Sequence, residues 1–184
     1  MSKLIVSEFI ALDGVIEAPE TWHFPYISED MAAHIEAALK TTDIMLYGRV
    51  TYEIFAGFWP TDEAKGESIA EKLNSAPKYV VSTTLASADW QNSTLIKTNV
   101  IDAIARLKRE TPGTIGITGS ATLIRALTQA GLIDEFQFLV HPIVLGQGLR
   151  LFDGLTAAVP LKLVETKTFT SGVVLLTYQP ASPA

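Results

Sequence analysis

The sequence contains no cysteine among its 184 residues, and charged side chains make up only 18% of it. The absence of cysteine excludes disulfides and thiolate catalysis. A formal net charge of −6 provides no basic surface for nucleic acid, so no nucleic-acid partner is expected. No apolar run is long enough to cross a membrane, and Glu8 and Asp13 interrupt the one N-terminal stretch that resembles a signal peptide. We therefore expect a cytoplasmic protein without membrane association.

Apolar residues are abundant by contrast, at 48% of the chain. A chain of 184 residues is long enough to bury one substantial core and short for two domains. We therefore expect a single domain over residues 1–179 and a loose C-terminal tail over 180–184. The apolar fraction also leaves surface for a partner subunit to cover.

Strand and helix patterns alternate along most of the chain, which predicts an α/β fold with helices on both faces of a sheet. The last third contains strand patterns at 135–140, 161–168 and 173–178, and a tight turn joins the final two. The expected sheet is therefore mixed, with an antiparallel C-terminal hairpin. The other predicted strands are 3–10, 43–47, 78–82, 94–97 and 114–117, and helices are predicted after Ser28, Gly48, Asn99 and Ser120 and at 64–74.

The stretch around Gly119 combines the features of a phosphate-binding turn. A β-branched strand stops at this glycine, Ser120 stands at the N-cap position, and a helix follows until Gly131. Such a turn places backbone N–H groups and a positive helix dipole beside a loop without bulky side chains. Many turns of this kind bind no ligand, so the stretch alone leaves both interpretations open. The candidate phosphate contacts are Thr118, Gly119, Ser120, Ala121 and Thr122.

A second glycine, Gly48, opens a helix directly after the strand at 43–47, and Arg49, Val50 and Thr51 form the first turn. A guanidinium suits phosphate because its planar fork donates two parallel charged hydrogen bonds. The alternative is that Arg49 is an ordinary solvated residue. Against that alternative, a cation in the first turn opposes the helix dipole, so its presence calls for a reason.

Taken together and in this order, 48–51, the Gly119–Ser120 turn, 132–135 and 141–152 resemble the dihydrofolate reductase-like proteins. The greater similarity is to the branch with the reductase domain of bacterial riboflavin biosynthesis, which residues 7–16 also fit. The resemblance implies a three-layer dihydrofolate reductase-like fold that binds NADPH and passes a hydride to a small heterocyclic or carbonyl substrate, pterin- or pyrimidine-like. The Pro-Cys-x-x-Cys element of the zinc deaminase that accompanies some riboflavin reductases is absent from this sequence.

The resemblance also implies roles for residues outside the two glycine turns. It assigns Ser82, Thr83 and Thr84 to the adenosine side of NADPH, near the 2′-phosphate, although polar residues are equally typical of a plain turn. In dihydrofolate reductases a Gly-Gly pair joined by a cis peptide lies beside the cofactor. The comparable pair here is Gly119–Ser120, so an unusual backbone is expected there.

Two carboxylates are the candidate catalytic residues. Asp13 follows the first strand, in the loop that in this family closes over the nicotinamide, and its alternative is a simple Asp-Gly turn. Asp30 lies in a helix comparable to the one in dihydrofolate reductases that carries an acid supporting protonation of the pterin, and its alternative is a favourable charge at a helix start. The three histidines, His23, His34 and His141, are too scattered to predict a metal site.

The C-terminal strands predict a homodimer. Phe136 and Phe138 alternate on one strand, and 173–176 is a continuous apolar run, which favours burial on both faces of the sheet. A second copy related by a two-fold axis would cover them, unless the helices already do so. Two functions of different classes remain open: an NADPH-dependent reductase, or a non-catalytic nucleotide-binding or dimerisation protein that keeps the fold.

Overall fold

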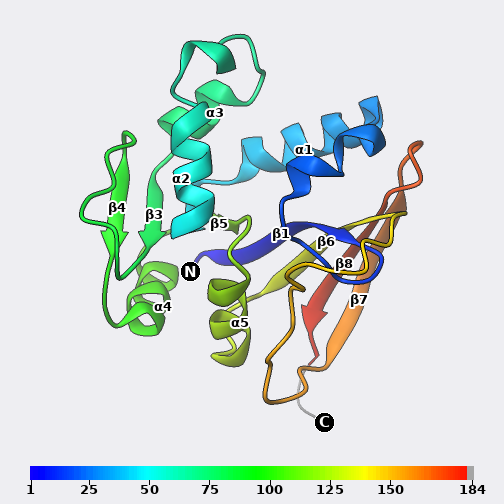
Figure 1. Ribbon diagram of the computed structural model, residues 1–184. Coiled ribbons are helices and arrows are strands. Elements are labelled where there is room, and N and C mark those ends of the chain that lie inside the picture. The colour runs from blue at the N-terminus through cyan, green and yellow to red at the C-terminus, as the bar shows by residue number, and fades with distance from the viewer. Residues whose placement is uncertain (182–184) are drawn as a thin grey trace.

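The computed structural model describes residues 1–181 and contains one eight-stranded mixed sheet (Figure 1). Across the sheet the strands lie in the order β4 (Ser93–Ile96), β3 (Lys78–Val81), β2 (Ile44–Gly48), β5 (Thr114–Ile117), β1 (Lys3–Ala11), β6 (Glu135–His141), β8 (Val174–Pro180) and β7 (Leu161–Thr168). The pairs from β4 to β6 are parallel, whereas β8 is antiparallel to both β6 and β7. The predicted α/β class, mixed sheet and antiparallel C-terminal hairpin are therefore confirmed.

Helices cover both faces of this sheet (Figure 1). One face carries α1 (Glu29–Thr41), α2 (Arg49–Phe58) and α3 (Ala70–Ser75), and the other carries α4 (Val100–Glu110) and α5 (Ala121–Gln129). Alternate side chains of β2 separate the two layers: Leu46 packs with Ile104 of α4 and Ile124 of α5. Its neighbour Tyr47 packs on the other face, with Tyr52 of α2. No helix within the described part of the chain is long and apolar enough to cross a membrane.

One predicted helix is wrong over most of its length. Instead of a helix over 64–74, the structure has a 3₁₀ turn at Asp62–Ala64 and the short α3. Gly66 lies between them with φ +102°, a backbone conformation that no right-handed helix contains. The predicted helix stop at Gly131 is confirmed. Gly131 has φ +65°, and the Leu132 N–H donates to the Leu127 carbonyl, which caps the end of α5.

Of the expected loose tail over 180–184, the first two residues are not loose. Pro180 is the last residue of β8, and the Ala181 N–H donates to the Pro160 carbonyl at 2.9 Å. The strand extends this far because β7 is long enough to pair with it, with Leu161 opposite Pro180. Residues 182–184 of the predicted tail lie outside the described residues.

Two glycine turns touch where the carboxyl ends of the neighbouring strands β2 and β5 meet. A Cβ built on Gly48 would lie 2.0 Å from the Oγ of Ser120, and one on Gly119 would lie 2.3 Å from the Oγ1 of Thr51. Each glycine therefore accommodates the hydroxyl side chain of the opposite turn. The contact between the two turns brings the first turns of α2 and α5 together at the side of the sheet where its parallel strands have their carboxyl ends.

This contact predicts that Gly48→Ala destabilises the fold by about 1–3 kcal/mol through overpacking. Its φ of −81° is open to any residue, so the effect is purely steric. The double variant Gly48→Ala/Ser120→Gly removes the clashing hydroxymethyl group and should recover most of the loss in denaturant unfolding.

Gly57→Ala, in the helix α2 that follows Gly48, is the matched control, because a Cβ there has no contact within 4 Å among the described residues beyond its own helix backbone. It should raise stability by about 0.5–1 kcal/mol, as expected for glycine replaced by alanine inside a helix. Equal stability of Gly48→Ala and wild type would contradict the steric account.

Candidate cofactor and substrate site

Two helix N-termini open at the contact between the glycine turns. α2 starts directly after Gly48 and α5 directly after Ser120, and neither helix has a side-chain cap from any residue of 1–181. The first N–H groups of a helix have no partner within it, and the helix dipole makes this end positive. Because β2 and β5 are parallel neighbours, both N-termini lie at the same edge of the sheet. The arrangement suits a phosphate-bearing ligand.

The backbone at Gly119–Ser120 is unusual, but the cis peptide that the resemblance implies is wrong. Every peptide bond in the described residues is trans. Instead, both residues lie in the left-handed region, with φ +71° and +68°. Two such residues in succession turn the chain from β5 into α5, so no cis bond is needed. Ser120 takes the predicted N-cap position, but its side chain packs on Gly48 and makes no capping hydrogen bond.

Polar residues at the start of α2 and directly after the neighbouring strand β3 reach the same edge. Arg49 is half-exposed, and its guanidinium pairs with Glu53 at 2.7 Å. An exposed pair of this kind contributes little, so a ligand phosphate can compete for the guanidinium. Ser82 is buried, and its Oγ accepts hydrogen bonds from two N–H groups of the turn that follows. Thr83 and Thr84 are exposed, which leaves these two hydroxyls, rather than that of Ser82, open to a ligand.

The remaining predicted cofactor residues differ in exposure. Thr118 and Thr122 flank the first turn of α5 and are exposed, as is Val50 on α2. Thr51 is half-buried in the contact between the turns, and Ala121, the first residue of α5, is buried. The structure thus gathers the predicted residues of both turns at one edge. Their contact with a cofactor stays a prediction.

Asp13 fastens a loop to the end of β1. Its Oδ2 accepts the Gly146 N–H at 2.8 Å, and the Arg150 guanidinium lies 3.7 Å away. The Gly146 hydrogen bond, with a smaller contribution from Arg150, lowers the pKa of Asp13 below its usual range. Its Oδ1 is buried without a hydrogen-bond partner among residues 1–181. Asp13 is therefore ionised and holds this loop, with one oxygen left for a further contact, and its catalytic role stays a prediction.

Asp30 is fully engaged in holding α1 to the β7–β8 hairpin. Its Oδ1 accepts hydrogen bonds from the Ser28 hydroxyl at 2.5 Å and the Thr170 hydroxyl at 2.9 Å, and its Oδ2 accepts the Thr170 N–H at 3.0 Å. The Ser28 hydroxyl first, and Thr170 next, hold the pKa of Asp30 at about 2. A carboxyl with that pKa is ionised near neutrality, so Asp30 is not itself a proton donor. A catalytic role in which it supports protonation of a substrate stays a prediction.

Two histidines lie together beyond the carboxyl ends of β1 and β6, although the sequence separates them widely. His141 ends β6, and the ring centroid of His23 is 6.3 Å from it. Burial lowers the pKa of both imidazoles, and His23 Nδ1 and His141 Nε2 are buried without hydrogen-bond partners in residues 1–181. No group of three or more potential ligands in this part of the chain is arranged to hold a metal ion. The rings that surround the two histidines are Phe9, Trp22, Phe24 and Tyr26.

Glu8 is the site residue that sequence reasoning missed. It lies on β1 between the core residues Val6 and Ile10 and is only 5% exposed. Its Oε1 accepts the Gly119 N–H at 2.5 Å, so it supports the turn from below. Burial raises the pKa of Glu8 to about 8, and the Gly119 hydrogen bond opposes this shift. The available signal was the alternation Leu4, Val6, Glu8, Ile10, which places an acid on the core face of the strand.

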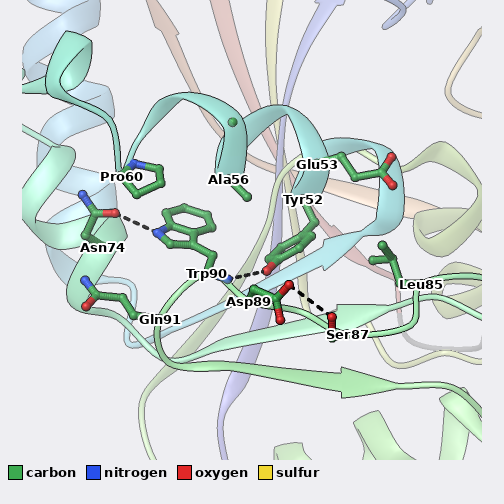
Figure 2. A pocket seen from close by; sticks show the side chains of 11 residues that line it. Tyr52, Glu53, Ala56, Pro60, Asn74, Leu85, Ser87, Asp89, Trp90 and Gln91 are labelled. Atoms are coloured by element: carbon green, nitrogen blue, oxygen red, sulfur yellow. Dashed lines mark hydrogen bonds between the residues drawn. The ribbon is translucent and has the colours of Figure 1, made fainter.

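A separate hollow of about 760 Å³ lies between α2 and the loop before β4 (Figure 2). Its walls include Glu53, Tyr52 and Trp90, but none of the predicted cofactor or catalytic residues. The Trp90 Nε1–H donates to Asn74 at 2.7 Å, and the Tyr52 hydroxyl accepts the Trp90 N–H at 2.9 Å. Tyr52, Trp90 and Asn74 are thus joined to one another by hydrogen bonds at this wall, as Figure 2 shows.

The sequence pattern of the RibD C-terminal domain matches residues 2–175, almost the whole chain. The chain belongs to the RibD C-terminal domain family. One relative is the uncharacterized protein YyaP of Bacillus subtilis. It is 32% identical over 178 residues, which cover 96% of this chain and 94% of YyaP. The family membership confirms the expected riboflavin-biosynthesis branch and indicates a reductase-type domain.

Solved structures agree with the fold of this RibD C-terminal domain. A putative riboflavin biosynthesis protein from Shewanella sp. PV-4 superposes with a TM-score of 0.80 at 22% identity, covering 98% of this chain and 99% of that one. A dihydrofolate reductase from Enterococcus faecalis, in complex with NADP(H), has a TM-score of 0.66 at 17% identity, covering 98% and 97%. At these identities the likeness concerns the fold, which is dihydrofolate reductase-like as expected.

Glu8 predicts an unusual dependence of stability on pH. Its folded pKa of about 8 lies above the ordinary value of 4.5, so the folded state holds this proton more tightly than the unfolded state. The stability that this contributes is full below pH 4.5 and is lost as pH rises towards 8. The free energy of unfolding of Glu8→Gln relative to wild type should therefore rise between pH 5 and 8, by up to about 1.4 kcal/mol per pH unit.

Urea unfolding across this range measures the difference. Glu135→Gln is the control, because Glu135 is a half-buried acid on the adjacent strand whose register partner, Ile5, lies on the opposite face from Glu8. That variant should keep the wild-type dependence. Parallel curves for Glu8→Gln and wild type would show that Glu8 does not carry a raised pKa.

Proposed function

We propose that this protein is an NADPH-dependent reductase that passes a hydride to a small heterocyclic or carbonyl substrate, pterin- or pyrimidine-like. The observation that carries the proposal is the pairing of two uncapped helix N-termini, of α2 and α5, at the carboxyl edge of adjacent parallel strands. In parallel α/β sheets this edge is where dinucleotide ligands bind. Membership of the RibD C-terminal domain family, and the NADP(H) bound to the structurally similar dihydrofolate reductase, support the same cofactor.

In this proposal the chain binds and orients the cofactor with groups from three strand ends. The pyrophosphate would accept hydrogen bonds from the N–H groups of the Arg49 and Ala121 turns. The 2′-phosphate would be held by the Arg49 guanidinium with the exposed hydroxyls of Thr83 and Thr84. When bound, the reduced nicotinamide supplies the hydride, and the protein contributes placement and a site poor in water.

The substrate would lie near the end of β1, against the aromatic loop over 22–26. This loop offers flat rings and His23, with His141 of β6 packed behind them, and such a cluster suits a planar heterocycle. Asp30 is not the proton source in this proposal, because its carboxyl is ionised and bonded to Thr170. A non-catalytic nucleotide-binding protein would use the same turns but show no turnover.

The cofactor proposal predicts that NADPH binds at least tenfold more tightly than NADH. An arginine that contacts phosphate supplies charge-assisted hydrogen bonds of about 1.5–3 kcal/mol. Arg49→Ala should therefore lose most of the preference for NADPH and leave NADH affinity nearly unchanged. Titration calorimetry with both cofactors measures the two affinities.

Arg109→Ala is the matched control, because Arg109 is an exposed arginine in the last turn of α4. It should bind both cofactors like wild type. Equal affinity of wild type for NADPH and NADH would remove the 2′-phosphate site from the proposal. NADPH oxidation with a panel of pterins, pyrimidines and carbonyls then separates a reductase from a binding protein.

We also propose that the chain forms a homodimer through its C-terminal strands. One face of the hairpin is covered by α1, where Val173 and Leu175 are buried. Along the edge strand β7, Leu163 and Val164 are exposed, and no helix lies over this strand in Figure 1. Light scattering at low micromolar concentration should give twice the chain mass of 20.0 kDa, and Leu163→Lys should shift it to the monomer. A wild-type monomer would rule the dimer out.

A further inference from the structure

A buried acid lies directly beneath the turn that the proposed function assigns to the cofactor phosphates. The Glu8 carboxyl accepts the N–H of Gly119, one residue before the N-cap of α5. An acid of the protein itself therefore already occupies one of the N–H groups of the turn that would bind the phosphates. A carboxylate and a pyrophosphate at the same turn are two anions in a poorly solvated place, which is unfavourable for both.

No charge of the surrounding core side chains compensates Glu8. The core residues that pack on its face of the sheet are apolar, among them Ile117 of β5 and Phe138, its register partner on β6. The titratable groups of the neighbouring elements are engaged elsewhere. On α5, Arg125 donates to backbone carbonyls of the loop at 150–151. On the first turn of α2, Arg49 pairs with Glu53, and in the loop after β1, Asp13 lies beside Arg150.

On the opposite face of β6, Glu135 accepts hydrogen bonds from Gln137 and Gln179, and the His141 Nδ1–H donates to the Leu139 carbonyl. These groups belong to the alternate residues of β6 and lie across the sheet from Glu8. Burial lowers the pKa of His141 and of His23, so both imidazoles titrate below the range in which Glu8 does. Glu8 is thus the group near the turn whose charge changes above neutral pH.

Protonation removes the conflict without removing the hydrogen bond. A neutral carboxylic acid keeps a carbonyl oxygen that accepts the Gly119 N–H, so the turn retains its support. At the same time the negative charge beneath the phosphates disappears. A bound dinucleotide phosphate therefore favours the protonated form of Glu8, and by linkage the protonated form binds the dinucleotide more tightly.

We propose that binding of NADPH at the Gly119 turn takes up a proton on Glu8, so that this one side chain makes cofactor affinity depend on pH. The inference rests on the proposed function, because it requires that NADPH occupy this turn. It assigns Glu8 a positioning role: the side chain supports the turn and tunes its charge, while the phosphate contacts come from the backbone and Arg49.

The test measures the dissociation constant of NADPH by titration calorimetry between pH 7 and 9.5. Wild-type affinity should fall as pH rises above about 8, by up to tenfold per pH unit, the limit for a single linked proton. Near pH 8.5, calorimetry in two buffers of different ionisation enthalpy should report net proton uptake on binding. Glu8→Gln keeps an amide oxygen for the Gly119 N–H but cannot ionise, so its affinity should vary less than twofold over the same range and match wild type at pH 7.

Glu135→Gln, with its altered acid across the sheet, should retain the wild-type slope and proton uptake. Melting temperatures measured alongside show whether each variant is folded. If Glu8→Gln is not folded, Glu8→Asn provides a second amide with a shorter side chain. A wild-type affinity independent of pH, an affinity that rises with pH, or a wild-type slope in the folded amide variant each overturns the inference and leaves the cofactor proposal standing. Absence of NADPH binding at every pH overturns both.

Discussion

The arrangement of this protein depends on one steric contact, the mutual packing of the two glycine turns. Gly48 leaves room for the Ser120 side chain, and Gly119 leaves room for Thr51. Hydroxyl groups that would cap a helix in another setting fill these spaces instead. The consequence is that α2 and α5 start side by side with their N–H groups uncapped by side chains of the described residues. The same contact that packs the two turns therefore also leaves these two positive helix ends side by side.

Glu8 links this edge to the core. A carboxyl in the middle of an apolar strand is costly to bury, and its hydrogen bond to Gly119 only partly offsets that cost. Proteins retain such groups where burial shifts a pKa into the working range of a site. Placing the acid beneath the turn, rather than facing solvent, couples the charge state of the core to whatever anion the turn binds.

The end of this edge at which we propose that the substrate lies is built on different chemistry. Asp13 and Asp30, both ionised, fasten loops and a hairpin around the end of β1. Besides the Oδ1 of Asp13, the groups with unmade hydrogen bonds there are the neutral imidazoles of His23 and His141, within a cluster of aromatic rings. Arg49 thus places a positive charge beside the glycine turns, whereas the other side combines aromatic rings with carboxylates that are already hydrogen-bonded. This division suits a charged dinucleotide beside an uncharged planar ring.

The sequence by itself determined the order and type of most elements, because apolar periodicity and glycine turns are local signals, and it located Gly48–Thr51 and Thr118–Thr122 at helix starts. It left open the surroundings of residues whose partners are distant in the sequence. Asp30 reads as a free acid until Thr170, 140 residues away, is seen to bind it. Glu8 reads as a break in an apolar run until Gly119 lies above it. Only the tertiary structure decides such cases, because the pKa of a carboxyl is set by the donors and solvent around it, which sequence spacing does not contain.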